Sequence, residues 1–257
     1  MKITYHISEL VPYINWVYYF FAWQVKDEAE KQRMQREALA KLAELEDKYH
    51  VYAVFQLFDA RSDGDDIVLA NSKRIPCLRQ QQGNPPYLCL ADFVSPNTSK
   101  IGLFATSVDM GLETDFDNDV YQKMMVQLLA DRLAEAAAER LHERVRKELW
   151  GYAKDENLSI ADMLIERFQG IRPAVGYPSL PDTSLNFVLD DILDMKQIGI
   201  RLTESGAMKP HASVSGLMIS NPKAKYFSIG KIGEDQLEDY ARRRGLPVEV
   251  VRKFVTL

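Results

Sequence analysis

Hydrophobic positions recur with a helical period in two long stretches of the chain. Between Val120 and Trp150 there is no Gly or Pro, and apolar residues return every fourth position, at Met125, Leu129, Leu133, Ala137, Leu141, Val145 and Leu149. This spacing predicts one helix of about 30 residues, roughly 45 Å long, which would cross the whole domain and end at Gly151. The stretch from Asp27 to His50 predicts a second, exposed helix with a single apolar stripe.

Shorter stretches predict strands and further helices. The run from Val51 to Ala60 is rich in β-branched and aromatic residues, which indicates a fully buried strand, and a turn at residues 61–65 leads into Ile67–Ala70 as its antiparallel partner. The other predicted strands are Pro86–Val94, Lys100–Val108, Ser213–Ser220 and Tyr226–Ile232, the last two forming a hairpin. The other predicted helices are Ser159–Phe168, Asn186–Gln197, Glu234–Arg244 and one that starts at Pro247.

Runs of strands and runs of helices are segregated along the chain. This order predicts the α+β class, with a mostly antiparallel sheet and a long central helix at about 120–150. A chain of 257 residues without a linker-like tract is expected to form a single domain over residues 1–257.

The composition excludes several classes of protein. There are 32 basic and 37 acidic residues, a net charge of −5, which argues against binding to nucleic acid or to a membrane surface. The longest mostly apolar run, Ile14–Trp23, is too short to span a membrane and is predicted to be buried. Cys77 and Cys89 cannot form a disulfide scaffold, and the four scattered His residues complete no metal motif. We therefore expect a cytoplasmic protein without a metal site.

Few residues suggest chemistry by themselves. No phosphate loop, nucleophile elbow or H-E-x-x-H motif is present, so no catalytic residue is predicted. The loop Gly170–Pro178 (GIRPAVGYP) is conformationally restricted, and its Arg172 suits a carboxylate ligand, although a surface ion pair explains the pattern equally well. Alanines around Glu135 would let a ligand come close, although mid-helix acids are usually solvated. His142 is predicted to be solvated, and His211, in a loop, is a weaker candidate for a functional group.

Many short segments, in order along almost the whole chain, resemble one known family. They include INW at 14–16, FFAW at 20–23, GDDI at 64–67, LRQQ at 78–81, CLADFV at 89–94, ADRLAEA at 130–136, LHERVR at 141–146, RPAVGYP at 172–178, LTES at 202–205, ASVSG at 212–216, KYF at 225–227 and DYARR at 239–243. By these segments the chain resembles the activation domain of cobalamin-dependent methionine synthase, the module that binds S-adenosylmethionine.

The resemblance implies a repair reaction. In this family, oxidation of the cobalamin leaves inactive cob(II)alamin. An electron from flavodoxin or a flavoprotein reductase, followed by methyl transfer from S-adenosylmethionine, restores methylcobalamin on the cobalamin-binding domain. The role of such a module is to position the methyl group and exclude water.

Nothing in the chain resembles the other modules of that enzyme, and the D-x-H-x-x-G cobalt-ligand motif is absent. We therefore expect an excised domain or a free-standing homologue, which would not make methionine alone. Two alternatives stay open: an accessory reactivation factor for another corrinoid methyltransferase, and an S-adenosylmethionine-binding module without methyl transfer.

The resemblance also assigns residues to the site. Arg172 would hold the carboxylate of the ligand, and Glu135 would contact its ribose hydroxyls. The other residues that would line or border the ligand are Ala174, Tyr177, Tyr226 and Phe227. Gly176 and Tyr177 would face the corrin. Asn15 stands where the family commonly has Asp, so it could accept a hydrogen bond from the ligand's ammonium group only without the charge, and weaker binding is expected.

An acidic chain that meets an acidic flavodoxin needs a local basic face. Two clusters are candidates: Arg144, Arg146 and Lys147 on the long helix, and Arg242–Arg244 near the end of the chain. A solvated helix face explains both clusters more simply.

Overall fold

The structure is a computed structural model that describes residues 1–255, and its centre is an antiparallel sheet. Five strands lie in the order β4-β3-β2-β5-β8, and β1 also pairs with β2. Their bounds are β1 Lys2–Tyr5, β2 Val51–Asp63, β3 Asp66–Leu69, β4 Arg74–Pro76, β5 Ser99–Val108 and β8 Ser213–Met218. A separate two-stranded sheet consists of β6 Arg201–Leu202 and β7 Met208–Lys209.

The helices cover both faces of this sheet. Their bounds are α1 Ile7–Leu10, α2 Trp16–Ala22, α3 Glu28–Leu45, α4 Gly111–Thr114, α5 Val120–Arg144, α6 Ile160–Leu164, α7 Leu185–Leu193, α8 Glu234–Arg244 and α9 Val248–Phe254. Short 3-10 turns lie at Val11–Tyr13, Leu90–Phe93 and Met195–Ile198, and a π turn, Val145–Leu149, continues α5. One core lies between α5 and one sheet face, and a second lies between α7 and the other face.

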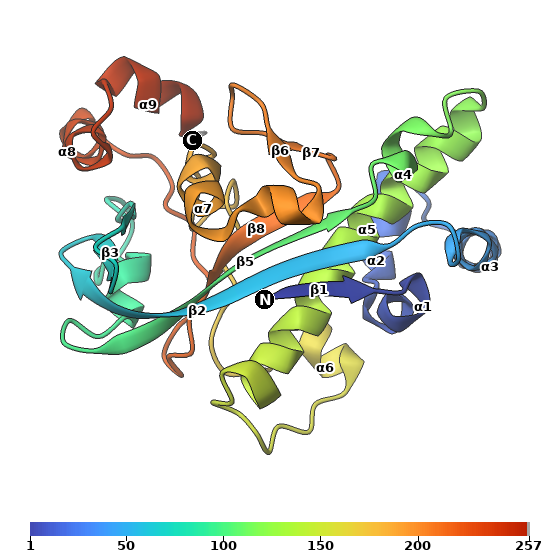
Figure 1. Cartoon of the computed structure of the whole chain (residues 1–257), viewed down its shortest axis with the longest axis horizontal. Helices are drawn as coiled ribbons and strands as arrows, with labels where there is room; N and C mark the ends of the chain where they lie inside the picture. Colours follow the sequence, from blue (N-terminus) through green and yellow to red (C-terminus); the bar gives the residue numbers. More distant parts are fainter. Residues whose placement is uncertain (256–257) are drawn as a thin grey trace.

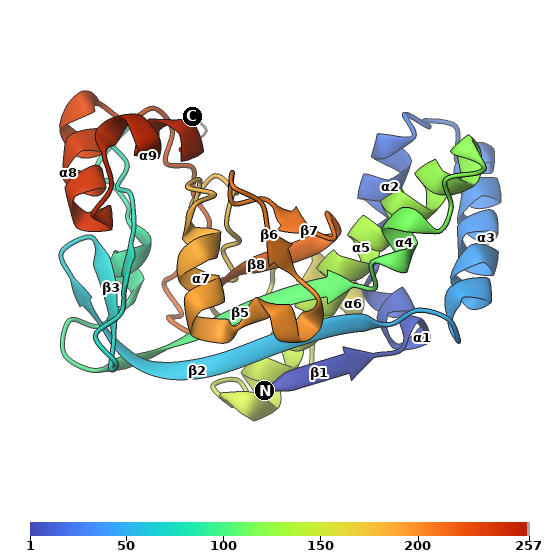
Figure 2. The same ribbon diagram turned by 45° about the horizontal axis from the view of Figure 1, so that its top comes forward.

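Strand β2 runs the length of the molecule (Figure 1). It pairs with β5 in a continuous register from Val51 opposite Val108 to Ala60 opposite Ser99. On its other edge, β1 pairs near its start and β3 near its end. Figure 2 shows an arm rising at each end of β2: the helical arm, made of α2, α3, α4 and the start of α5, and the C-terminal arm, made of β3, α8 and α9.

The sequence analysis predicted the fold class and the main elements correctly. The sheet is antiparallel, the fold mixes helices and strands as an α+β domain, and the long helix α5 starts at Val120 and continues through the π turn to Leu149. Asp119 caps its first turn by accepting a hydrogen bond from the Gln122 N–H, and Gly151 follows it with a positive φ. The hairpin partner of β2, predicted at residues 67–70, is β3.

Two predicted strands were wrong. The segment Pro86–Val94 is a loop that ends in a 3-10 turn, because the Asp92 carboxylate accepts a hydrogen bond from the Cys89 N–H and turns the chain. Tyr226–Ile232 forms no strand, since the free edge of β8 is already taken by the chain at 171–175. Ile171 pairs there with Ile219, and Ala174 pairs with Gly216.

Several predictions of burial were also wrong. The run Ile14–Trp23 is buried on one side only, because α2 exposes its other side to solvent. His142 is fully buried rather than solvated, since the chain at 150–170 covers that side of α5. The basic clusters are solvated only in part. Arg242 is exposed, and Arg144 and Lys147 are partly exposed. Arg146, however, is fully buried with Glu156, and Arg243 and Arg244 are largely buried in ion pairs with aspartates.

Other differences concern boundaries. The strand predicted as fully buried, β2, is mostly buried over residues 51–55, but between residues 56 and 63 only Ala60 is buried. The helix predicted at Asn186–Gln197 breaks at Asp194, which adopts a left-handed conformation, and α6 ends at Leu164 rather than Phe168. None of the helices in the described part of the chain combines the length and hydropathy needed to cross a membrane.

Candidate functional site

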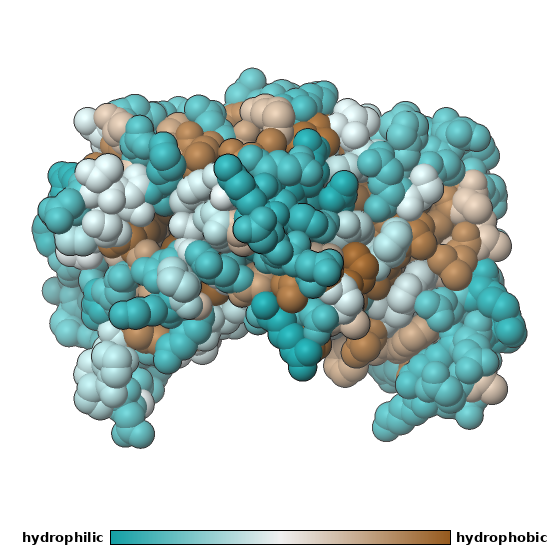
Figure 3. All heavy atoms as spheres, turned by 90° about the horizontal axis from the view of Figure 1, so that it is seen from below, coloured by the Kyte–Doolittle hydropathy of each residue, from teal (hydrophilic) through white to brown (hydrophobic). Residues whose placement is uncertain are grey.

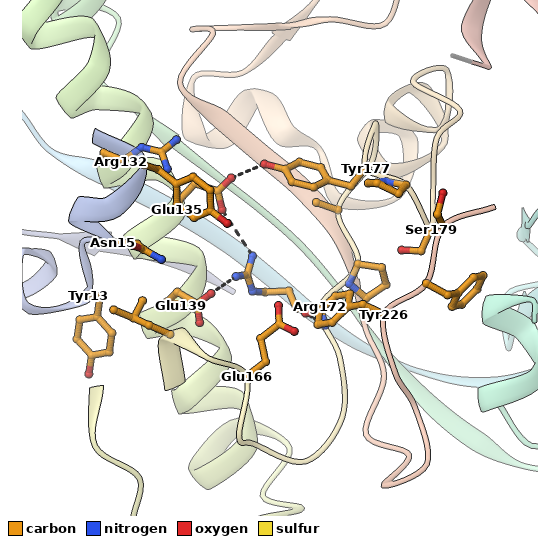
Figure 4. Close-up of a pocket in the computed structure, with 17 residues that line it drawn as sticks. Tyr13, Asn15, Arg132, Glu135, Glu139, Glu166, Arg172, Tyr177, Ser179 and Tyr226 are labelled. Carbon is orange, nitrogen blue, oxygen red and sulfur yellow. Dashed lines mark hydrogen bonds and ion pairs between the residues drawn. The ribbon is translucent and has the colours of Figure 1, made fainter. Parts of the chain in front are cut away.

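A cleft of about 650 Å³ lies between α5, the start of α2 and the loop at 172–179 (Figure 4). This volume suits a small organic ligand. The residues that line it are Tyr13, Asn15, Tyr18, Arg132, Glu135, Glu139, Leu164, Glu166, Arg172, Pro173, Ala174, Tyr177, Pro178, Ser179, Tyr226, Phe227 and Ser228. Within residues 1–255, no group of three His, Cys, Asp or Glu side chains could hold a metal ion.

Helix α5 forms one wall of the cleft. Arg132, Glu135 and Glu139 follow one another at spacings of three and four residues, so their side chains emerge on the same face of the helix. The neighbouring alanines at 134, 136, 137 and 138 are buried and let the sheet approach closely. The wall therefore presents one guanidinium and two carboxylates to the cleft.

The loop that carries Arg172 is held on β8 by backbone pairing. The N–H of Ile171 donates to Ile219, the N–H of Val175 donates to Ser215, and the N–H of Leu217 donates to Pro173. A Cβ on Gly216 would collide with the carbonyl oxygen of Pro173, so only glycine allows this close approach. The strand thus fixes the backbone from which the Arg172 side chain extends.

The guanidinium of Arg172 is buried between acidic groups. Its side chain is 9% exposed, one Nη donates to Glu139 and the other lies 4.0 Å from the Glu135 carboxylate. Burial opposes the charge, but Glu139, Tyr226 and Glu135 outweigh it, so the pKa of Arg172 is raised and the group stays a cation. Its Nε has no hydrogen-bond partner among the described residues. The site therefore contains a permanent cation with donor capacity left over.

Two tyrosines lie near this arginine. The Tyr177 hydroxyl donates to the Glu135 carboxylate at 2.6 Å, as Figure 4 shows, and burial together with Glu135 raises the pKa of Tyr177. The Tyr226 hydroxyl accepts a hydrogen bond from the backbone N–H of Arg172 at 2.9 Å. Tyr177 is half exposed, so it borders the opening, whereas Tyr226 braces the loop.

Asn15 has a structural role as well as a place in the cleft. It is the N-cap of α2, and its Oδ1 accepts a hydrogen bond from the Val17 N–H at 3.2 Å. A carbonyl oxygen has two lone pairs, so one acceptor position remains for a ligand.

Glu166 lies in the cleft with its backbone in the left-handed region, at φ 61°. Only a few per cent of non-glycine residues adopt this conformation, and they concentrate at functional sites. Burial raises the pKa of its carboxyl, and the nearby Glu139 raises it further, while Arg172 lowers it. The sequence analysis missed Glu166, because it assigned this residue to a helix over Ser159–Phe168, whereas α6 ends at Leu164.

A buried polar cluster lies behind Arg172. The Nε2 of His142 lies 3.3 Å from the Tyr152 hydroxyl, and its ring meets Phe168 edge to face. Arg146, placed by the π turn, pairs with Glu156 at 2.7 Å and stacks on the Phe168 ring. Burial lowers the pKa of His142, and the charges of Arg146 and Arg172 lower it further, so this imidazole is neutral. The cluster anchors the segment that leads into the Arg172 loop.

The structure brings most of the predicted site residues together. Seven of them line the one cleft: Asn15, Glu135, Arg172, Ala174, Tyr177, Tyr226 and Phe227. Gly176 adjoins Tyr177 but is not part of the lining, and His211 lies elsewhere, 3.8 Å from Glu113. Arg132 and Glu139 were missed, although their helical spacing from Glu135 is a signal that could have found them.

Comparison with known proteins identifies the family. Residues 6–245 match the family described as vitamin B12 dependent methionine synthase, activation domain. The chain belongs to this family. A solved structure described as the MetH reactivation domain bound to AdoHcy is 39% identical, with a TM-score of 0.94, and the match covers 99% of this chain and 88% of that one. AdoHcy is S-adenosylhomocysteine, which is S-adenosylmethionine without its transferable methyl group.

Membership confirms the expectation drawn from the sequence segments. The activation domain described here has the fold of the MetH reactivation domain over almost its whole length. The role of each cleft residue toward a ligand stays a prediction.

Proposed function

We propose that this activation domain binds S-adenosylmethionine in the cleft and presents its methyl group for reductive methylation of the corrinoid on a cobalamin-binding domain. The corrinoid supplies the methyl acceptor, and a flavodoxin or flavoprotein reductase supplies the electron. Cys77 and Cys89 are both free, which fits a reducing compartment such as the cytoplasm. The observation that supports the proposal most directly is a buried arginine with spare donors inside an acidic cleft.

The charges of the cleft suit this ligand. S-adenosylmethionine carries a carboxylate, an ammonium group and a sulfonium. Arg172 can donate to the carboxylate through its free Nε and second Nη, and such charge-assisted bonds are the strong ones. Two arginines and three glutamates line the cleft, so its own charge is negative and favours a ligand with a net positive charge.

The remaining cleft residues are proposed to contact the other parts of the ligand. Glu135 would accept hydrogen bonds from the ribose hydroxyls, and Asn15 would accept one from the ammonium group. Ala174, Tyr177 and Phe227 supply apolar surface. None of these groups needs to exchange a proton during methyl transfer, so the domain acts by binding, orienting and excluding water.

Calorimetric titration with S-adenosylmethionine tests the proposal. We expect saturable binding that Arg172→Ala weakens by about 1.5–3 kcal/mol, because hydrogen bonds to a charged group are lost. The matched control is Arg167→Ala, since Arg167 lies five residues earlier, is exposed and pairs with Asp162. Equal affinities of the wild type and both variants would contradict the placement of the carboxylate.

Methyl transfer needs a separate measurement. With a cobalamin-binding domain and a reductant added, label from S-adenosylmethionine should appear as methylcobalamin. Binding without label transfer would favour the alternative of a binding module alone. Transfer only to another corrinoid methyltransferase would favour the accessory-factor alternative. Absence of binding, alone and with the cobalamin-binding domain, would overturn the proposal.

A further inference from the structure

A second cleft, of about 670 Å³, lies between α7 and the C-terminal arm. Its lining comes from the turn before β4, the start of α7, the end of α8 and helix α9. Figures 1 and 2 both show α9 beside α7. Among the described residues, none lines both this cleft and the proposed S-adenosylmethionine cleft. The two clefts are therefore separate sites.

One wall of the second cleft is apolar. It consists of Phe187 and Val188 from α7, Leu246 from the turn after α8, and Val250 and Phe254 from α9. The rings of Phe187 and Phe254 meet edge to face, with their centres 6.5 Å apart. Because these rings pack on each other, they leave no slot between them in which a planar base could stack. The wall therefore suits an aliphatic group better than a nucleobase.

A buried arginine lies beside this apolar wall. The side chain of Arg244 is 8% exposed, one Nη donates to the Ser184 hydroxyl at 2.7 Å, and its Nε lies 3.3 Å from the Asp182 carboxylate. Asp182 is held in turn by the Tyr240 hydroxyl, which donates to it at 2.7 Å. The other Nη of Arg244 forms no hydrogen bond within the described part of the chain. The cleft thus contains a fixed guanidinium with donor capacity left over.

Two more cations line the opposite side of the same cleft. Arg74 donates to Asp66 at 3.1 Å and to Asp63 at 2.7 Å, while its Nε makes no hydrogen bond to any of residues 1–255. Lys73 pairs with Asp191, which is the single carboxylate in the described lining. These partners hold the cationic side chains in place, so their remaining donors are preorganised for an anion.

We propose that the second cleft binds an amphipathic carboxylate. Its carboxylate would accept hydrogen bonds from Arg244, Arg74 and Lys73, and its aliphatic body would cover the wall formed by Phe187 and Phe254. The volume and the mostly apolar lining with a few charged groups are those of small-molecule sites. A nucleotide or sugar phosphate would leave polar groups without partners against the apolar wall. The inference is independent of the proposed function.

Calorimetric titration of the whole chain with three eight-carbon probes tests the chemistry of the site. We expect octanoate to bind saturably at one site. Octanamide should bind at least tenfold more weakly, because it lacks the charge-assisted hydrogen bonds, and octylammonium should not bind. The affinity for octanoate should be the same without S-adenosylmethionine and at its saturating concentration, since the two clefts are separate.

Arg74→Gln tests the head-group contact. This variant should weaken octanoate about tenfold and leave octanamide unchanged, a difference that a general loss of structure would not produce. The matched control is Arg61→Gln. Arg61 lies 4.0 Å from the same Asp63 but does not line the cleft, so its loss should change neither probe.

Val250→Asp tests the apolar wall. The new carboxylate would lie beside the aliphatic body of the probe, so octanoate binding should be lost. Val248→Asp is the matched control, because Val248 is also a half-buried valine of α9 but is not part of the lining. It should keep the affinity of the wild type. Far-UV circular dichroism shows whether both variants are folded, and if Val250→Asp is not, Arg74→Gln carries the test alone.

Four outcomes would overturn the proposal. Equal affinities for octanoate and octanamide would remove the anion site. Equal effects of Arg74→Gln and Arg61→Gln, or of the two folded aspartate variants, would place the probe elsewhere. Displacement of octanoate by S-adenosylmethionine would place it in the first cleft. Tighter binding of adenosine monophosphate than of octanoate, at saturating S-adenosylmethionine, would assign the second cleft to a nucleotide.

Discussion

Asn15 shows how one side chain can serve the fold and the ligand together. It caps α2 and also lines the cleft. Asp is an equally good N-cap, so Asn15→Asp should keep the start of the helix while adding a negative charge that faces the ligand's ammonium group. We expect S-adenosylmethionine to bind about fivefold tighter, since a charge-assisted hydrogen bond replaces a neutral one.

Calorimetry on Asn15→Asp beside Asn97→Asp checks this expectation. Asn97 lies in an exposed turn, so the second variant changes the net charge equally without touching the cleft. Equal or weaker binding by Asn15→Asp would place the ammonium group elsewhere.

His142 makes the stability depend on pH. The folded protein holds this imidazole neutral because burial and the charges of Arg146 and Arg172 lower its pKa. The unfolded chain binds a proton as the pH falls through about 6.5. The contribution of His142 is therefore fully present above that pH and is lost below it. Between pH 7 and pH 5, the free energy of unfolding should fall by about 2 kcal/mol from this group.

Urea unfolding of the wild type and of His142→Gln at both pH values measures this effect. The glutamine variant should be less stable at pH 7 but lose less stability on acidification. Parallel pH profiles for the two proteins would show that His142 is not the group responsible.

Single residues were predictable where a motif marked them. Arg172 and Tyr177 lie in a loop restricted by prolines and a glycine, and that restriction is visible in the sequence. Glu166 was not predictable, because its place in the cleft depends on a left-handed backbone conformation set by tertiary contacts. His142 has charged neighbours in the sequence, yet it is buried because a distant segment folds over it.

At the scale of elements, the contact between β8 and the loop at 171–175 determines the position of Arg172 in the cleft. Gly216→Ala would push the loop away from β8, because the new Cβ meets the carbonyl oxygen of Pro173. We expect a loss of about 1–3 kcal/mol of stability from overpacking. Binding of S-adenosylmethionine should also weaken about tenfold, because a displaced Arg172 loses its bond to the ligand.

Val214→Ala is the matched control for this change. Val214 is a buried residue of the same strand, so its truncation also destabilises the protein, but it leaves the loop contact intact. Thermal unfolding and calorimetry on both variants separate the two effects. Weakened binding in both, or in neither, would show that the strand does not set the position of Arg172.

Elements were predictable where periodicity was long and local. The apolar period of α5 persists through 25 residues, and β5 and β8 are continuous runs of mostly buried residues that pair with each other. The predicted strands at 86–94 and 226–232 failed for two different reasons. A local side-chain hydrogen bond turned the first segment, and the edge that the second would have used was already occupied by a loop from earlier in the chain. Competition for a sheet edge cannot be read from one segment alone.

At the scale of the whole molecule, the continuous pairing of β2 with β5 joins the two arms (Figure 2). At roughly 3.3 Å per residue, the 13 residues of β2 span about 43 Å. Bending the paired strands β2 and β5 would break buried backbone hydrogen bonds, and each unsatisfied buried backbone group costs free energy. We therefore expect the radius of gyration from small-angle X-ray scattering to be the same with and without S-adenosylmethionine. A measurable contraction on binding would contradict a preformed site.

The length of β2 has a consequence for recognition. The paired strands β2 and β5 connect the two arms. The distance between the arms is therefore fixed when the sheet folds. The hollow visible between the arms in Figure 3 therefore keeps a constant width. A partner that entered this gap would have to be narrow enough to fit between two arms whose separation does not change.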